Sequence, residues 1–205
     1  MIISYPAEAP EVRAFRNRIY EEDLGLSSDI ISTFDRANPV SDNQFAYWYS
    51  DQKFLTNGFD QVMIFHWDGE PVGLCGGTLY NKYLYRGCTQ YYILSKYRKM
   101  LARESLLQRP GGFMPHGIDR AIELGCKAYF VCMHTYDRRH SRYWEGLRRD
   151  LFLGDMISAK QKQYSAKDFV FLEKEYEIMY TKQRVFYRDL NGEGVDFDDL
   201  YNFGK

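Results

Sequence analysis

The feature that most constrains the fold is an apolar run, KAYFVCMH at residues 127–134. Because nearly every position in it is apolar, we expect a strand that is buried on both faces. A helical pattern at 113–124, ended by Gly125, precedes this run, and another strand pattern, CTQYYILS at 88–95, precedes the helix. Two strands joined through a helix pair in parallel with a right-handed crossover. The sequence therefore predicts a parallel strand pair at residues 88–134.

The other strand patterns indicate antiparallel pairing. QVMIFHW (61–67) runs into Asp68-Gly69, a strong hairpin signal, and PVGLCGGTLY (71–80) returns. With residues 88–95, these strands are predicted to form an antiparallel meander. The remaining expected elements are helices at 9–25, 41–55 and 136–151, a strand at 2–5 and two strands within 168–190. The predicted fold class is α/β (α+β), a mixed and mostly antiparallel sheet with one parallel pair and helices on both faces.

The length and charge of the chain limit the classes of protein to consider. Its 205 residues suit one domain with a substantial core, which we expect at residues 1–190, followed by a loose acidic tail at 191–205. The net charge of −1 argues against nucleic acid or an anionic membrane as a partner. No run of about 18 apolar residues is present to span a membrane, and MIISYPAEAP at the start has no basic region of a signal peptide. We therefore predict a soluble, cytoplasmic protein.

The cysteines and an acidic loop bear on metal binding. No pair of cysteines has the C-x-x-C spacing, so reduced, structural thiols are expected. DLNGEGVDFDDL (189–200) imitates a calcium loop, but Leu200 stands where a bidentate Glu should close the shell. The sequence thus predicts no metal site. The cysteines concerned are Cys75, Cys88, Cys126 and Cys132.

Two short motifs flank the buried strand. RPGG (109–112) stands directly before the central helix, and DRRHSRYWEGL (137–147) follows the strand. In this order of elements the chain resembles the GNAT superfamily of acyl-CoA N-acyltransferases. The resemblance covers most of the chain in element order, and its motifs fall within residues 90–147. It implies acetyl-CoA or another acyl-CoA as cofactor, with the pyrophosphate at the N-terminus of the central helix, where backbone N–H groups and the helix dipole attract anions.

The anion loop of that family, R/Q-x-x-G-x-G/A, can be aligned with this chain from Arg98. The strand that precedes the loop is then expected to end at Tyr97 and Arg98. Leu101 and Arg103 would occupy the two glycine positions. A leucine Cβ disfavours positive φ and hinders a close backbone approach, which weakens this alignment.

The second alignment begins at Arg109 and is the one we prefer, because it keeps a glycine and leads directly into the helix. It puts Met114 where Gly or Ala is expected and makes residues 99–108 an insertion with a helical pattern. The resemblance also implies a splayed strand whose backbone pairs with the pantetheine arm, and a backbone N–H that polarises the thioester carbonyl. The residues that the resemblance assigns to the cofactor, with Arg98 in support, are Arg109, Gly111, Gly112, Phe113 and Met114 for the pyrophosphate, and Ile93 and Leu94 for the thioester.

Catalytic candidates come from the same region. The family commonly has a tyrosine whose hydroxyl protonates the leaving thiolate, but this chain has Trp144 at that position, and Tyr143 is one residue away. An indole N–H does not supply a proton at neutral pH. His134 ends the parallel strand, where ligands gather in open α/β sheets, and with Glu145 it is a candidate base.

The resemblance implies an N-acetyltransferase that moves an acyl group from acyl-CoA to an amine by direct attack. The acceptor would be a small-molecule or peptide amine, and the possible assembly is a homodimer. A non-catalytic binding or interaction protein with the same fold is the main alternative, favoured by the atypical loop and by Trp144. A third alternative, an enzyme similar to acyl-homoserine-lactone synthases, requires an acyl-chain site for which we find no signature.

Overall fold

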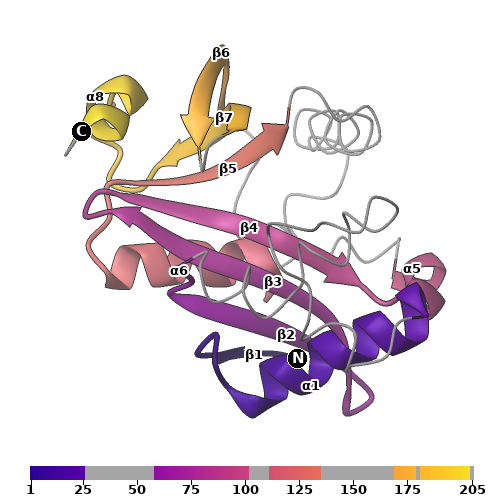
Figure 1. Cartoon of the computed structure of the whole chain (residues 1–205). Coiled ribbons are helices and arrows are strands. Elements are labelled where there is room, and N and C mark those ends of the chain that lie inside the picture. The colour runs from indigo at the N-terminus through magenta and orange to yellow at the C-terminus, as the bar shows by residue number, and fades with distance from the viewer. Residues whose placement is uncertain (26–57, 102–110, 135–168, 179–180, 204–205) are drawn as a thin grey trace. The chain divides into compact units, whose positions relative to one another are not determined.

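The computed structural model describes residues 1–25, 58–101, 111–134, 169–178 and 181–203 (Figure 1). The helices expected at 41–55 and 136–151 lie outside these residues. The described elements are β1 (Ile2–Tyr5), α1 (Pro10–Arg18), the π-helix η1 (Ile19–Leu24), β2 (Gln61–Trp67), β3 (Glu70–Asn81), β4 (Leu84–Ile93), α5 (Ser95–Leu101), α6 (Phe113–Glu123), β5 (Ala128–His134), β6 (Val170–Ile178), β7 (Thr181–Asp189) and α8 (Phe197–Asn202).

The described strands are hydrogen-bonded in the order β1-β2-β3-β4-β5-β7-β6. β4 and β5 pair in parallel, whereas β1 with β2, β2 with β3, β5 with β7 and β6 with β7 pair antiparallel. The mixed sheet with one parallel pair confirms the predicted fold class. Within the described residues, no helix combines the length and apolar character that crossing a membrane requires.

The chain forms two compact units, the first of which comprises Met1–Thr78 and Thr89–Ser105. In this unit α1 begins with Pro10 in its first turn and packs its apolar side on β2 and β3 (Figure 1). The expected helix ends its α-helical part at Arg18 and continues as the π-helix η1 up to Leu24. The buried core of this unit consists of Val12, Phe15, Ile19, Val62, Ile64, Leu74, Tyr92 and Leu94.

The second unit comprises Leu79–Cys88 and Leu106–Lys205. The division runs through strands of one sheet, and the single domain at 1–190 stays a prediction. The core of this unit holds apolar residues from β4, β5, β6, β7 and α8. Its buried members are Leu84, Ala128, Phe130, Cys132, Tyr176, Ile178, Val185, Phe197, Leu200 and Tyr201.

The C-terminal segment is ordered, so the expected loose tail at 191–205 is wrong as far as Phe203. Three apolar side chains spaced at i, i+3 and i+4 lie buried on one side of α8: Phe197, Leu200 and Tyr201. Asp196 begins the helix, and its side chain accepts a hydrogen bond from the Asp198 N–H at 2.8 Å. The acidic composition concealed this short amphipathic helix.

β4 differs from the strand expected at 88–95. It begins at Leu84, because the Asn81 side-chain oxygen accepts hydrogen bonds from the N–H groups of Tyr83 and Leu84 and closes a tight turn there. The strand ends at Ile93, so the expected exit at Tyr97 and Arg98 is wrong. The helix expected within 99–107 instead begins at Ser95.

The parallel pair is short. Residues Leu84, Tyr85 and Arg86 of β4 pair with Ala128, Tyr129 and Phe130 of β5. β4 then continues to Ile93 and β5 to His134, beyond the end of this register.

A buried tyrosine lies where the register ends. Tyr129 has no exposed surface, and a Cβ added to Gly87, the first β4 residue beyond the register, would overlap its ring and hydroxyl. A Cβ on Gly117 of α6 would come within 3.0 Å of the same ring. Glycine at position 87 thus lets the Tyr129 ring pass close to the β4 backbone.

Gly87→Ala is therefore expected to lower the free energy of unfolding by about 1–3 kcal/mol, the usual range for an overpacked core. In a Tyr129→Leu background the same substitution should cost much less, because the overlapping ring atoms are absent. Denaturant unfolding of the wild type, both single variants and the double variant measures this coupling. Strictly additive costs would contradict the close contact between position 87 and the ring.

The acidic loop after β7 is held by one carboxylate. Asp189 Oδ1 accepts hydrogen bonds from the N–H groups of Asn191 and Gly192, and Oδ2 accepts from those of Gly194 and Val195. Burial acts to raise the pKa of Asp189, but these four backbone donors outweigh it and hold the pKa below its ordinary value of 3.8. The stretch that imitates a calcium loop is thus a turn built around its own aspartate.

Because the folded-state pKa of Asp189 is lowered, its contribution to stability is fully present above the ordinary carboxyl pKa and is lost as the pH falls through the folded-state value. Asp189→Asn should reduce the free energy of unfolding by about 1 kcal/mol at pH 7, which is below the ~1.5–3 kcal/mol of a hydrogen bond to a buried charged group, because solvent screens this partly exposed carboxylate. Chemical denaturation at pH 7 and pH 3 should show the difference between wild type and variant shrinking at the lower pH. A difference that is constant with pH would contradict this prediction.

Candidate functional site

The N-terminus of α6 carries the features expected of an anion site. Gly111 is exposed and adopts a positive φ of 71°, which favours glycine. Gly112 is the N-cap residue, with φ −83° and ψ 178°, and as a glycine it has no side chain with which to cap the helix. The first N–H groups of a helix lie at the positive end of its dipole, which attracts anions.

Phe113 is fully buried and Met114 is 2% exposed, so both side chains belong to the packed interior. Pro115, which follows, contributes no N–H, and the donors of the first turn come from the residues before it.

His116 is tied to the same helix start. Its Nδ1 lies 3.0 Å from the Gly112 carbonyl oxygen, and its backbone N–H donates to the same oxygen at 3.2 Å. Because a carbonyl oxygen only accepts, Nδ1 carries the hydrogen in this contact. The imidazole thereby stabilises the bend from the glycine pair into α6.

At the end of β4, the structure corrects the role expected for Leu94. Its N–H donates to the Val72 carbonyl oxygen at 3.0 Å, and its own carbonyl accepts from the Tyr97 N–H at 2.9 Å. The Leu94 side chain is fully buried. This amide is thus engaged within the protein, and it is not positioned to polarise a thioester. Ile93 remains as the last residue of β4.

Arg98 lies on the helix α5 and not in a loop, which corrects the alignment that begins at this residue. Its Nε donates to the Ile93 carbonyl oxygen at 2.8 Å, and its guanidinium lies over the Tyr92 ring at 4.9 Å. Nη2 is 3.6 Å from Asp23 Oδ2. The guanidinium is therefore part of the packing around the end of β4.

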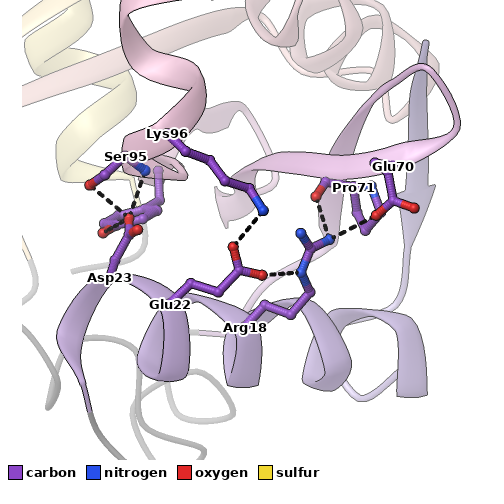
Figure 2. A network of polar contacts seen from close by, with 8 residues as sticks. Arg18, Glu22, Asp23, Glu70, Pro71, Ser95 and Lys96 are labelled. Atoms are coloured by element: carbon purple, nitrogen blue, oxygen red, sulfur yellow. Dashed lines mark hydrogen bonds and ion pairs between the residues drawn. The ribbon is translucent and has the colours of Figure 1, made fainter.

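The N-terminus of α5 is occupied by a carboxylate of the protein itself, Asp23 of η1 (Figure 2). Asp23 Oδ2 accepts from the Ser95 N–H at 2.8 Å, the Ser95 hydroxyl at 3.0 Å and the Tyr92 hydroxyl at 2.7 Å. Burial, together with this hydrogen bond, raises the pKa of Tyr92 above its ordinary value, so the phenol stays a donor. An acceptor is thus already present at this helix start.

The preceding residue, Glu22, makes exposed ion pairs with Lys96 and Arg18, both at 2.8 Å (Figure 2). Hydrogen bonds from these two cations lower the pKa of Glu22. Arg18, the last residue of α1, also donates to the Pro71 carbonyl oxygen at 2.9 Å and so links the end of α1 to the start of β3.

The expected catalytic residues are only partly within the described residues. The backbone of His134 ends β5, with Gln183 of β7 as its partner in the register. Tyr143 and Glu145 lie outside the described residues, as does Arg109. Their roles stay predictions.

The described residues contain no group of three or more His, Cys, Asp or Glu side chains arranged to hold a metal ion. Cys75, Cys126 and Cys132 are buried free thiols.

The chain matches no family model and no curated protein by sequence. Its structure is similar to that of a candidate acetyltransferase of the GNAT family from Desulfovibrio desulfuricans, with a TM-score of 0.51 and 9% identity over 93% of this chain and 99% of the other. The chain has the GNAT fold. This confirms at the level of the fold the resemblance seen in the element order.

Two further structures overlap at lower scores. An aminoglycoside 6′-acetyltransferase type Ii has a TM-score of 0.49 and 8% identity over 93% of this chain and 97% of the other. YncA of Salmonella typhimurium, a structure that contains acetyl-CoA as its cofactor, has a TM-score of 0.47 and 12% identity over 96% of both chains.

Sequence reasoning missed Asp23, Tyr92 and Ser95. The carboxylate is 69 residues from the phenol and 72 residues from the serine, so no local spacing connects them. The only local cue is the run EED at 21–23, which puts three acidic residues at the end of an amphipathic helical pattern. Contacts of this sequence separation require the fold.

If the start of α6 binds an anion, a carboxylate at the N-cap should compete with it. Gly112→Asp is expected to abolish the stabilisation of the protein by coenzyme A, since the new side chain accepts from the first-turn N–H groups and repels phosphate. Gly112→Asn, which has the same shape without the charge, is the matched control and should retain more of the effect. Thermal unfolding with and without coenzyme A measures both. Equal, wild-type-like stabilisation of the two variants would count against this anion site.

Proposed function

We propose that this protein is an acyl-CoA N-acyltransferase that transfers an acetyl or related acyl group to an amine. The observation that carries the proposal is the start of α6: a glycine pair without a side-chain cap, in a helix that follows the parallel strand β4 within the GNAT fold. The fold by itself does not determine function, so the proposal depends on this local chemistry.

The residues present fit an acyl-CoA in two respects. The uncapped helix start offers backbone donors at the positive end of a dipole, which suits a pyrophosphate, and Arg109 is proposed to add a positive charge. β4 extends beyond its register with β5 after Arg86, and we propose that this stretch pairs with the pantetheine arm. Of the expected binding residues, Gly111, Gly112, Phe113, Met114 and Ile93 are retained.

Acetyl-CoA supplies an acyl group activated as a thioester. In the proposed reaction the amine nitrogen bonds to the acyl carbon, the carbon–sulfur bond breaks, and the nitrogen gives up a proton. His134 and Glu145 are the proposed bases for that proton, and Tyr143 the proposed donor to the leaving sulfur. Binding both reactants side by side contributes a large part of the rate, since effective molarities are worth roughly 7–11 kcal/mol. No metal is invoked in these steps.

The proposal is tested by the effect of acetyl-CoA on thermal unfolding. At about one hundred times its dissociation constant, a ligand stabilises a protein by about 2.7 kcal/mol, so the melting temperature should rise clearly. Arg109→Ala should remove most of this shift, because it removes a phosphate contact. Arg120→Ala, at the other end of α6, is the control for the loss of one positive charge and should keep the shift. No shift with millimolar acetyl-CoA would contradict the proposal.

A binding protein without catalysis is the second candidate, because the Leu94 amide, the donor expected for the thioester carbonyl, is engaged with Val72. Release of free CoA in the presence of amines, peptides and aminoglycosides distinguishes the two functions. Acetyl-CoA binding with release of CoA supports the transferase, and binding without release for any of these acceptors supports the binding protein.

A further inference from the structure

The Asp23 carboxylate holds together the end of β4 and the start of α5. Its side chain is 6% exposed, and the hydrogen bonds and the ion pair that the structure gives it all end on Oδ2. The donors are the N–H and hydroxyl of Ser95 (Figure 2), the Tyr92 hydroxyl and Nη2 of Arg98. A single nearly buried oxygen therefore organises four donor groups.

These donors lie on both sides of the point where the strand becomes a helix. Tyr92 is the second-last residue of β4, and Ser95 is the first residue of α5. Between them, Ile93 accepts from Arg98 Nε and Leu94 donates to Val72. The direction in which the chain leaves β4 is thus fixed by contacts that converge on Asp23.

Glu22, the carboxylate next to Asp23 in the chain, is more exposed to solvent. Glu22 lies on the same element and also reaches α5, through Lys96, but its side chain is 32% exposed and that of Lys96 is 54% exposed. Exposed ion pairs contribute little to stability, whereas hydrogen bonds to a nearly buried charge contribute more. The two adjacent acids of η1 therefore differ in what their removal should do.

We propose that Asp23 is a positioning residue for the cofactor: its carboxylate sets the course of the end of β4 and thereby the affinity for acyl-CoA. The inference rests on the proposed function, in which β4 beyond Arg86 pairs with the pantetheine arm. Pairing of that kind requires N–H and C=O groups in a fixed direction, and a loosened strand end supplies them less well.

The sign of the effect separates positioning from electrostatics. Coenzyme A is an anion, so removing a negative charge from the protein should by Coulomb's law strengthen binding. If Asp23 acts by position, its removal weakens binding instead. Asparagine keeps an acceptor oxygen for Ser95 and Tyr92 without the charge, so it should preserve much of the position.

The test measures binding of coenzyme A by titration calorimetry to the full chain and to three variants. Asp23→Ala should raise the dissociation constant about tenfold or more, which equals ~1.4 kcal/mol and is in keeping with lost hydrogen bonds to a charged group. Asp23→Asn should raise the dissociation constant about threefold, and the matched control Glu22→Gln should leave it within about twofold, as for an exposed ion pair.

If Asp23→Ala does not fold, two other variants test the same contacts. Tyr92→Phe and Ser95→Ala each remove one side-chain donor, and each should raise the dissociation constant about threefold.

The same variants give a kinetic readout that a loss of folded protein would not produce. With acetyl-CoA varied, KM should rise while kcat calculated per total protein stays near the wild-type value, whereas partial unfolding lowers this apparent kcat and leaves KM unchanged. Unchanged or tighter binding by Asp23→Ala, or an equal effect of Glu22→Gln, would overturn the inference while the wild type still binds. A wild-type protein that binds no coenzyme A would overturn the proposed function as well.

Discussion

The short parallel contact between β4 and β5 is the constraint on which the second half of the fold depends. Two parallel neighbours cannot be joined by a tight turn, so the chain must leave β4, cross over and return to β5 in the same direction. That crossover contains both α5 and α6. The register that the structure describes runs from Leu84 to Arg86, and Gly87, next to it, leaves room for the buried Tyr129 ring.

The N–H groups at the starts of the described helices meet different acceptors, and the proposed function depends on this difference. α8 has the Asp196 side chain as its cap, and the start of α5 is held by Asp23. α6 begins with Gly112, which has no side chain to offer. A helix start that already has a carboxylate is poorly suited to an external anion, and the N-cap residue of α6 does not supply one. For this reason, the phosphate alignment through Arg109 is preferred to the one through Arg98.

Much of the fold can be predicted from the periodicity of apolar residues and from turn-forming residues in the sequence. The alternation at 61–67 with Asp68-Gly69 predicts the hairpin, and the apolar run at 127–134 predicts the buried β5. The errors have local causes. The Asn81 turn starts β4 early, and α8 is too short and acidic to stand out as amphipathic. For the site, the glycine pair was visible in the sequence, but Asp23 was not, because its partners come from a distant part of the chain.

We propose that the start of α6 receives the pyrophosphate of an acyl-CoA. Amide ¹H–¹⁵N NMR spectra recorded during a titration with coenzyme A test this proposal, since each backbone N–H reports separately. We expect the largest changes at Gly111 to Met114, with smaller changes at Ser95, whose N–H is bound to Asp23. Unchanged signals at Gly111 to Met114 at saturating coenzyme A, or changes concentrated at Ser95, would contradict it.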